Sequence, residues 1–443
     1  MKTKRRLIFI YLQIIGLFIM SSSILISCDN KKEDLGSAIE YDPSKPVELT
    51  TFHPDSGRIS ESVILQGSNF GNDPSLVKVY FNKKKASVIK TVGDRMLVMV
   101  PRMPGDTCSV SVVVGNDSVI YSRNFYYRMS VSVSDVVGNG TPAYQGGALS
   151  ESTLRPAYIC VDNEGNIFAS SRESANNQYG IIRINEMEGL ATSLIMGNSA
   201  LIIPDALCPD KKTGIIYIPS EHSITGFYTC DPKEYWAPRM KNIIWRNLNG
   251  HALPVNPWKH SMGFCELDGC VYTRFYDGQI VKINPKTMDT DIVYMTAAGT
   301  SEGVTFDPLH PEMLYLAVRS GSMAGGIYSM DIRDPSSFKR LNAAGSGHRD
   351  GELSQALFNA PYQIYFDPDG NLYIADKSNH CIRRIRPDHI VETVVGIPGV
   401  AGWKNGSKED ALFNNPQGVG VDGEGTVYVA DYGNSRVRKL AIE

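Results

Sequence analysis

The chain has 443 residues, of which 42% are hydrophobic and 21% are charged, and its formal net charge at pH 7 is −3. This balance excludes the basic surface expected of a nucleic-acid-binding protein and gives no sign of electrostatic binding to a membrane surface. The eight cysteines are scattered along the chain, which excludes the dense disulfide framework of a small secreted domain.

The N-terminus has the pattern of a secretory signal. Four basic residues among the first six precede an apolar run from Leu7 to Ile26. A basic start and an apolar middle are typical of a signal peptide, although about 20 apolar residues would also span a bilayer. The run ends in Leu25–Cys28 (LISC), which resembles a bacterial lipobox, in which the cysteine is lipidated. We therefore expect residues 1–27 to be a lipoprotein signal peptide and Cys28 to be the lipidation site.

A polar segment follows the lipobox. Asp29–Asp34 (DNKKED) resembles the surface-export signal of Bacteroidota lipoproteins, which combines lysine with acidic residues. That resemblance implies a lipid-anchored protein of the outer membrane that faces the cell exterior. Residues 28–46 show no periodic pattern and are expected to form a tether.

Residues 47–128 contain short alternating runs that predict a small unit of β-strands. Among them are Leu65–Gly71 (LQGSNFG) and Val77–Asn82 (VKVYFN). These runs resemble an IPT/TIG domain, which implies an immunoglobulin-like sandwich. Such domains commonly act as spacers, and the sequence shows no chemistry in this one.

The C-terminal part of the chain repeats itself. Ala360–Ile385 reads APYQIYFDPDGNLYIADKSNHCIRRI, and Asn415–Leu440 reads NPQGVGVDGEGTVYVADYGNSRVRKL. Each copy has two apolar runs joined by an Asp-x-x-Gly turn, and then an arginine-rich run, which predicts three strands. Four weaker copies begin at Tyr158, Ala206, Gly263 and Val304. A repeat of this size cannot bury its own faces, so it must stack on its neighbours.

The spacing of the repeats predicts a closed ring. Aromatic residues on the expected second strands are separated by 43 to 58 residues, and they are Phe168, Tyr217, Tyr272, Tyr315, Tyr373 and Tyr428. This spacing accommodates four short strands, and six four-stranded sheets make a β-propeller. The last repeat lacks a fourth run, whereas Ser132–Gly138 (SVSDVVG) matches one. We therefore expect this N-terminal segment to supply the outer strand of the last blade.

The repeats resemble the NHL repeat family, closely in the last two copies and the first and more loosely in the middle three. Together with the IPT/TIG resemblance, this implies an all-β chain. It would have an immunoglobulin-like sandwich over residues 47–128 and a six-bladed NHL-type β-propeller over residues 129–443.

Recurring charged residues in the repeats have structural explanations. One aspartate ends each first strand, where its side chain favours a tight turn rather than a metal site; these are Asp162, Asp210, Asp268, Asp307, Asp367 and Asp422. Arginines recur on the third strands, where a solvated blade face or pairing between blades is expected; these are Arg183, Arg383, Arg384, Arg436 and Arg438.

Two cysteine pairs lie close together in the expected strands. Cys265 and Cys270 flank one hairpin turn, and Cys208 and Cys230 lie on strands of one blade. Either pair could form a disulfide, although their low density favours buried free thiols.

The position four residues after each aromatic residue is a candidate ligand contact. The repeat does not determine the residue type there, and the six residues are Arg172, Glu221, Tyr276, Arg319, Lys377 and Tyr432. Aromatic faces stack on sugars, and guanidinium groups bind hydroxyls or carboxylates with paired donors. We therefore predict a ligand-binding face made by Arg172, Arg274, Tyr276, Arg319, Lys377, Tyr432 and Trp258.

An enzyme is an alternative function. Some related propellers are lyases or lactonases that hold a metal at the channel mouth, and His222, His380, Glu221 and Glu302 could form such a cluster. No spacing requires it, and the chain has no nucleophile-elbow motif or phosphate loop. We therefore predict no catalytic residue, no metal and no cofactor.

The combination of lipid anchor, spacer and propeller resembles the auxiliary surface glycan-binding lipoproteins of starch-utilisation-type systems in gut Bacteroidota. It implies binding of a polysaccharide or oligosaccharide and a TonB-dependent transporter with its lipoprotein lid as partners. Since fold alone does not determine function, a protein–protein interaction scaffold is a second alternative.

Overall fold

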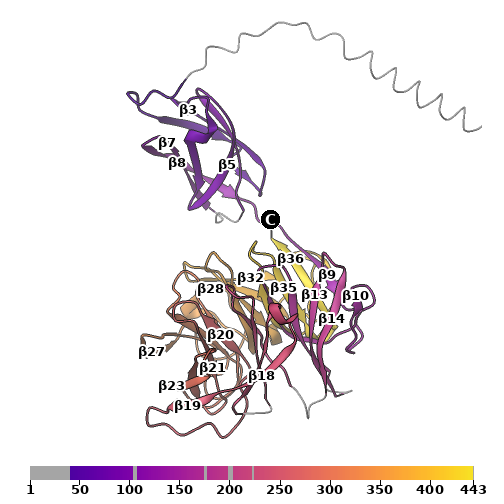
Figure 1. The fold of residues 1–443 in the computed structure, drawn as a ribbon. Coiled ribbons are helices and arrows are strands. Elements are labelled where there is room, and N and C mark those ends of the chain that lie inside the picture. The colour runs from indigo at the N-terminus through magenta and orange to yellow at the C-terminus, as the bar shows by residue number, and fades with distance from the viewer. Residues whose placement is uncertain (1–39, 103–106, 174–176, 198–202, 222–223, 443) are drawn as a thin grey trace, which may run out of the picture. The chain divides into compact units, whose positions relative to one another are not determined.

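The computed structural model describes residues 40–102, 107–173, 177–197, 203–221 and 224–442. The chain divides into two compact units, Met1–Arg128 and Met129–Glu443 (Figure 1). The predicted signal peptide and Cys28 lie outside the described residues. Among the residues that are described, no helix has the length and apolar character needed to cross a membrane.

The first unit is a β-sandwich whose strands run in the order β1-β3-β6-β5-β4-β7-β8-β2. Their bounds are Glu48–His53 (β1), Ser56–Gly57 (β2), Ser62–Ser68 (β3), Val77–Phe81 (β4), Lys84–Val92 (β5), Arg95–Met99 (β6), Thr107–Val114 (β7) and Asp117–Tyr127 (β8). The long strand β5 pairs with β4 through its first residues and with β6 through its last, so it joins the two layers. Alternate residues of each strand point inward, and Phe52 on β1 meets Tyr121 on β8 with ring centroids 5.2 Å apart.

The second unit has six sheets that form the blades of a β-propeller. The first strand of each blade contacts the first strands of both neighbours, which closes a ring around the centre. These inner strands are Pro156–Val161 (β11), Cys208–Pro209 (β15), Met262–Cys265 (β20), Ser301–Phe306 (β24), Pro361–Phe366 (β29) and Pro416–Val421 (β34). Most of their residues are buried on both faces, because they pack against two blades at once.

Further strands complete each blade outward. The second strands are Ile167–Glu173 (β12), Ile216–Pro219 (β16), Cys270–Arg274 (β21), Met313–Val318 (β25), Leu372–Asp376 (β30) and Val427–Asp431 (β35). The third are Gln178–Asn185 (β13), Gly226–Cys230 (β17), Gln279–Ile283 (β22), Gly326–Asp331 (β26), Cys381–Ile385 (β31) and Arg436–Ile442 (β36). The fourth are Leu190–Gly197 (β14), Pro238–Asn242 (β18), Asp289–Met295 (β23), Asp334–Arg340 (β27) and Ile390–Val395 (β32), with Val131–Val137 (β9) in the last blade.

Four blades carry an extra short strand at their outer edge. These strands are Gly147–Ala148 (β10), Ile244–Asn247 (β19), Gly351–Glu352 (β28) and Gly406–Ser407 (β33). The six predicted aromatic residues all fall on second strands, as the spacing of the repeats indicates.

Strand β9 closes the ring, which confirms the expectation for Ser132–Gly138. It pairs antiparallel with β36, the last strand of the chain, with Val133 opposite Leu440. The last blade is therefore built from both ends of the propeller sequence.

The recurring aspartates make turns, as expected. The Asp162 carboxylate accepts the backbone N–H groups of Glu164 and Asn166 at 2.9 and 2.8 Å. Asp367 accepts those of Asp369 and Asn371, both at 2.9 Å. Each carboxylate thus satisfies backbone donors of its own turn.

The expectation of a solvated face is wrong for three of the third-strand arginines. Arg383 and Arg438 have fully buried side chains, and Arg384, which is 4% exposed, pairs with Glu392 on β32. Arg383 donates to Asp376 at 2.9 Å, and Arg438 donates to Asp431 at 3.1 Å, both from the third strand to the end of the second. These arginines connect strands within one blade and cannot face solvent.

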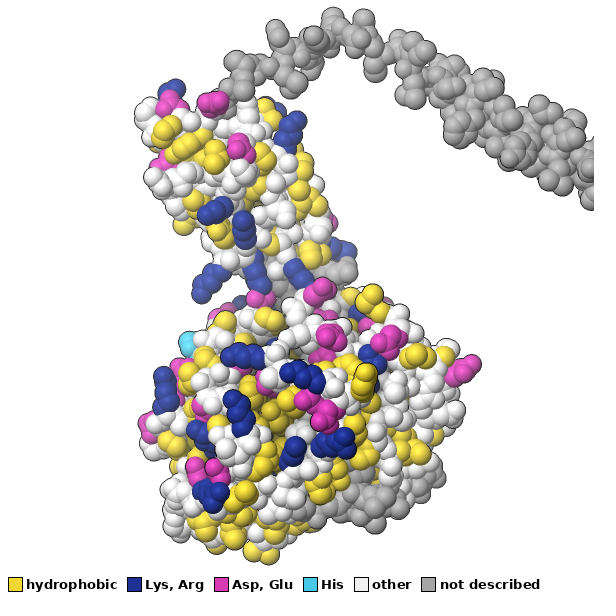
Figure 2. Space-filling view, in the orientation of Figure 1, with side chains coloured by type: hydrophobic (Ala, Val, Ile, Leu, Met, Phe, Trp, Pro, Cys, Tyr) yellow, Lys and Arg dark blue, Asp and Glu magenta, His cyan; other side chains and the backbone are white. Residues whose placement is uncertain are grey.

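The seven cysteines of the described residues are buried and free. Cys265 and Cys270 lie opposite each other in the β20–β21 hairpin without a disulfide. Figure 2 shows basic and acidic side chains interspersed on the visible face of the propeller, in keeping with the small net charge.

Candidate functional site

The ring of inner strands has a pocket at each end. The first, which we call the charged pocket, has a volume of about 490 Å³. Its lining residues are Tyr158, Arg172, Tyr179, Glu221, Trp258, His260, Thr300, Glu302, Arg319, Tyr362, Lys377, Gln417 and Tyr432. The second, which we call the apolar pocket, has a volume of about 370 Å³. Strand β29 reaches both, since Tyr362 near its start lines the charged pocket and Tyr365 near its end lines the apolar one.

The charged pocket lies at the end of the ring where the second strands end and the inner strands begin. Arg319 directly follows β25, Lys377 follows β30 and Tyr432 follows β35. The loops that follow second strands in several blades therefore point their first side chains toward one opening.

Five of the seven predicted ligand contacts line this pocket, namely Arg172, Trp258, Arg319, Lys377 and Tyr432. Arg274 and Tyr276 do not line it. Arg274 is 2% exposed and donates to the Gly299 carbonyl at 2.7 Å and to the Thr296 hydroxyl at 2.9 Å. Tyr276 packs edge-on against Trp258, with ring centroids 5.4 Å apart. Both side chains are therefore used in contacts within the third blade.

Inner-strand residues complete the site, and of these only Glu302 was named from the sequence, as a possible metal ligand. Tyr158, Glu302, Tyr362 and Gln417 lie near the starts of their strands and line the pocket. A signal was present, because each is a polar or aromatic residue at the start of an otherwise apolar run, and three of the four follow a proline by one or two positions.

One side of the pocket holds a compact ion network. Arg172 donates to Asp205 at 2.6 Å and to Glu221 at 3.1 Å. The Nδ1 atom of His260 lies 3.2 Å from Glu221. Burial opposes the charged imidazole, but Glu302, Asp205 and Glu221 outweigh it and raise the pKa of His260 to about 10. Burial likewise opposes ionisation of Glu221, yet His260 and Arg172 lower its pKa to about 2.

A second network lies around Glu302, which is 1% exposed. Its carboxylate accepts the Tyr158 hydroxyl, and it pairs with Arg319 Nε at 2.5 Å. Burial raises the pKa of Glu302, but His260 and Arg319 outweigh it, so that the pKa is lowered. Glu302 is therefore an ionised carboxylate held inside the pocket.

Tyr362 lies between two cations. The Arg319 guanidinium carbon is 5.3 Å from the centre of its ring, and Lys377 Nζ is 4.4 Å from it. Lys377 Nζ also donates to the Tyr362 hydroxyl at 3.0 Å. Burial, followed by the charge of Arg319, lowers the pKa of Lys377. An ammonium group that stacks on an aromatic ring and has lost part of its hydration is stabilised when an anion binds beside it.

Asp205, Glu221 and His260 form the one group of potential metal ligands within the described part of the chain, with donor atoms no more than 4.8 Å apart. Arg172 already binds both carboxylates of this group. Two members of the alternative cluster considered from the sequence have other partners: His380 accepts the Asn415 N–H at 3.1 Å, and Glu302 pairs with Arg319. His222 lies outside the described residues.

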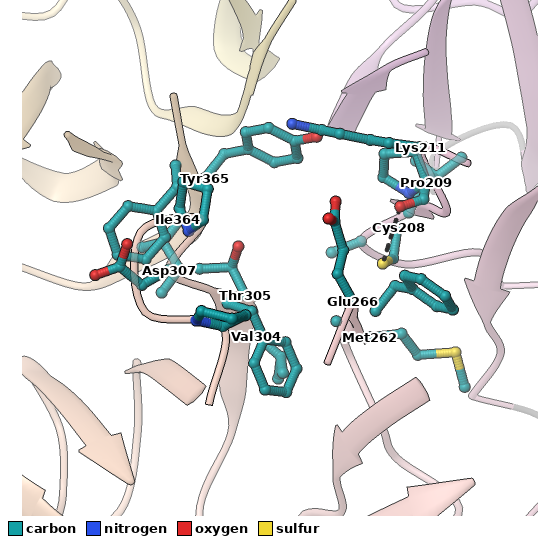
Figure 3. A pocket seen from close by; sticks show the side chains of 18 of the residues that line it. Cys208, Pro209, Lys211, Met262, Glu266, Val304, Thr305, Asp307, Ile364 and Tyr365 are labelled. Atoms are coloured by element: carbon teal, nitrogen blue, oxygen red, sulfur yellow. Dashed lines mark hydrogen bonds between the residues drawn. The ribbon is translucent and has the colours of Figure 1, made fainter. Parts of the chain in front are cut away.

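The apolar pocket is built differently. Its walls include Leu207, Met262, Val304 and Ile364, and Figure 3 shows Lys211 and Glu266 facing the cavity. Lys211 Nζ lies 5.7 Å from the centre of the Tyr365 ring, so a lysine–tyrosine contact exists at each end of the ring of strands.

Comparison with known proteins agrees with the two-part fold. A family model described as IPT/TIG domain matches residues 46–127, and one described as NHL repeat matches residues 358–385 and 413–440. The chain therefore contains an IPT/TIG domain followed by NHL repeats.

Solved structures share the fold over most of the chain. A structural genomics protein of unknown function from Bacteroides thetaiotaomicron is 22% identical, covers 91% of this chain and 100% of its own, and has a TM-score of 0.74. An auxiliary nutrient binding protein from the same organism is 20% identical, covers 91% of this chain and 99% of its own, and has a TM-score of 0.59.

Curated relatives match over shorter regions. Protein SUPPRESSOR OF QUENCHING 1, chloroplastic, from Arabidopsis thaliana is 28% identical over 197 residues. That match covers 42% of this chain and 17% of the relative, so the chain spans less than a fifth of the relative's length.

Proposed function

We propose that this chain is a nutrient-binding protein that holds an oligosaccharide in the charged pocket. The observation that carries the proposal is that aromatic rings and charged donors from separate blades meet around one opening. Its volume of about 490 Å³ lies in the range of about 300–1,000 Å³ that is usual for small-ligand sites.

The lining residues have the chemistry that sugars need. Trp258 is 43% exposed at the pocket, so its ring is available to stack on the apolar face of a pyranose. Tyr276 holds this indole in place, both through its ring and by donating its N–H to the Trp258 carbonyl at 2.9 Å. Tyr179 and Tyr432 add further rings, and Arg172 and Arg319 add paired donors.

The cellular setting is part of the proposal. The lipobox-like Leu25–Cys28 and the acidic segment after it support a lipid anchor at Cys28 and exposure at the surface of the outer membrane. The similar fold of an auxiliary nutrient binding protein supports the same role. In that role the ligand would be passed to a TonB-dependent transporter with its lipoprotein lid.

A metal-dependent lyase or lactonase is the competing function, and the Asp205, Glu221 and His260 group is the observation in its favour. Arg172 argues against it, because its guanidinium pairs with both carboxylates and occupies acceptor positions that a metal would need. A metal at this group would have to displace Arg172.

Titration calorimetry of the purified protein against a panel of oligosaccharides tests the proposal. We expect dissociation constants in the micromolar to millimolar range, or roughly 4–8 kcal/mol of binding free energy. Trp258→Ala should weaken binding at least about tenfold, the effect of roughly 1.4 kcal/mol. If no oligosaccharide binds, and the protein instead turns over a glycan in a way that chelation abolishes, the enzyme function replaces this one.

A further inference from the structure

The cations of the charged pocket differ in how they are paired. Arg172 binds Asp205 and Glu221, and Arg319 binds Glu302. Lys377 is different: among the described residues its ammonium group contacts the phenol and ring of Tyr362 and no carboxylate. It is half-buried at the opening where the proposed ligand would lie.

The arginine and lysine side chains that line the pocket are Arg172, Arg319 and Lys377, and its carboxylates are Glu221 and Glu302. Arg172 pairs with Glu221, and Arg319 pairs with Glu302. Each carboxylate of the lining therefore already has an arginine partner, whereas the ammonium group of Lys377 meets no carboxylate of the described residues.

Arg319 strengthens the preference for an anion beside Lys377. Its Nε atom binds Glu302, while the side chain stays 35% exposed. Within the described part of the chain its Nη atoms have no hydrogen-bond partner, and the guanidinium carbon lies 5.3 Å from the centre of the same Tyr362 ring that Lys377 contacts. A carboxylate placed over Tyr362 would thus meet an ammonium group and a guanidinium edge, which together make a strong anion contact.

We propose that the charged pocket selects an acidic oligosaccharide, one that contains a uronic acid, and that Lys377 with Arg319 binds the sugar carboxylate. This inference rests on the proposed function, because it specifies the class of oligosaccharide that the same pocket binds. A neutral glycan would leave Lys377 without a counter-charge, and an acidic one supplies it.

The apolar pocket provides a matched control for Lys377. Lys211 is also half-buried, its pKa is also lowered by burial, and its ammonium group also lies over a tyrosine ring. It differs in position, since it lines the pocket at the opposite end of the ring of strands. Lys211→Met and Lys377→Met therefore remove the same charge from the same kind of environment, and only the second removes it from the proposed site.

The experiment compares uronic acid oligosaccharides with their own methyl esters, which keep the rings and hydroxyls but lose the charge. The full chain, solubilised in detergent, is titrated with oligogalacturonate, oligomannuronate and a glucuronate-containing oligosaccharide, each as acid and as ester. We expect at least one acid to bind about tenfold or more tightly than its ester, a difference of roughly 1.4 kcal/mol. This preference should shrink as salt concentration rises, because an exposed ion contact is screened.

The variants then assign the preference to a residue. Lys377→Met should abolish the difference between acid and ester by weakening acid binding more than ester binding, Lys377→Arg should retain the difference, and Lys211→Met should behave as the parent protein. Equal affinity for acid and ester, or equal loss of both in Lys377→Met, would overturn the inference. If only neutral oligosaccharides bind, this inference fails and the proposed function stands; if no oligosaccharide of any kind binds, the proposed function fails with it.

Discussion

At the scale of single residues, a buried ion pair explains a motif of the repeats. In the last two blades an aspartate ends the second strand, an asparagine follows three residues later and an arginine four residues after that. The carboxylate of Asp431 accepts the Asn414 N–H at 2.8 Å, the Asn434 amide at 2.8 Å and Arg438 at 3.1 Å. Because the aspartate is fully buried, it depends on all three partners.

Arg438→Ala should therefore destabilise the propeller strongly, by about 3–5 kcal/mol, because it leaves the buried carboxylate of Asp431 without its cation. Lys439→Ala is the control on the next position of the same strand. Its partner Glu186 is 36% exposed, so the loss should be about 1 kcal/mol or less. Urea unfolding of both variants measures the difference, and equal midpoints would contradict the structural role of the pair.

His260 should make stability depend on pH. Carboxylates raise its pKa to about 10 from the ordinary value of 6.5, so the folded state holds a proton that the unfolded chain releases. The stabilisation is complete below about pH 6.5 and is lost as the pH rises through about 10. His260→Gln removes this contribution, so its deficit in melting temperature relative to the parent should be largest near pH 6 and shrink at alkaline pH.

Lys259 titrates in part of this range, since burial lowers its pKa to about 7. Asp205 titrates there as well, because its complete burial raises its pKa to about 7. Both groups are present in the parent and in the variant, so the comparison at each pH reports the whole effect of removing His260, including its effect on these neighbours. A deficit that stays constant from pH 6 to 10 would show that His260 acts by packing alone.

At the scale of elements, the repeat pattern predicted the propeller well and its site only in part. Alternation, Asp-x-x-Gly turns and the aromatic spacing determine where strands lie, and all six aromatic residues fall on second strands. The same periodicity does not show which side chains point into the centre. Tyr158 and Tyr362 were missed because, as strand residues, they look like part of an apolar run.

Side-chain packing, and not loop length, separates Arg274 and Tyr276 from the residues that line the pocket. Four residues join the second and third strands in blade three, and four residues also join them in blades five and six, where Lys377 and Tyr432 do line the pocket. Arg274 donates to backbone and side-chain groups inside the protein, and Tyr276 packs against Trp258. The repeat pattern does not contain this information.

Strand β9 is the element that closes the ring, and its removal should abolish cooperative unfolding of the propeller. Without it β36 becomes an unpaired edge in the last blade. We expect a chain that begins at Asn139 to lack a single sharp transition, whereas one that begins at Met129 should melt as the intact propeller does. Calorimetry of the two truncated chains makes the comparison, and identical melting curves would show that closure does not depend on β9.

At the scale of the whole molecule, the two pockets divide the propeller into unlike ends. Four blades supply the walls of the apolar pocket, and four of its lining residues are charged. At the opposite end the charged side chains form close ion pairs at the opening, such as Arg319 with Glu302. Composition could not predict this difference, because a net charge of −3 averages over both ends.

We expect the cellular location of the protein to be determined by residues outside those that the structure describes. Cys28→Ala should leave an unlipidated precursor that the outer membrane no longer retains through a lipid. Changing Lys32-Glu33-Asp34 to alanine should keep lipidation but reduce cleavage by protease added to whole cells, because the export signal is lost. Replacing Lys83-Lys84-Lys85 with alanine, an equal number of changes in the IPT/TIG unit, is the control and should leave cleavage unchanged. Unaltered cleavage after the first triple substitution would mean that the segment after Cys28 does not direct the protein to the surface.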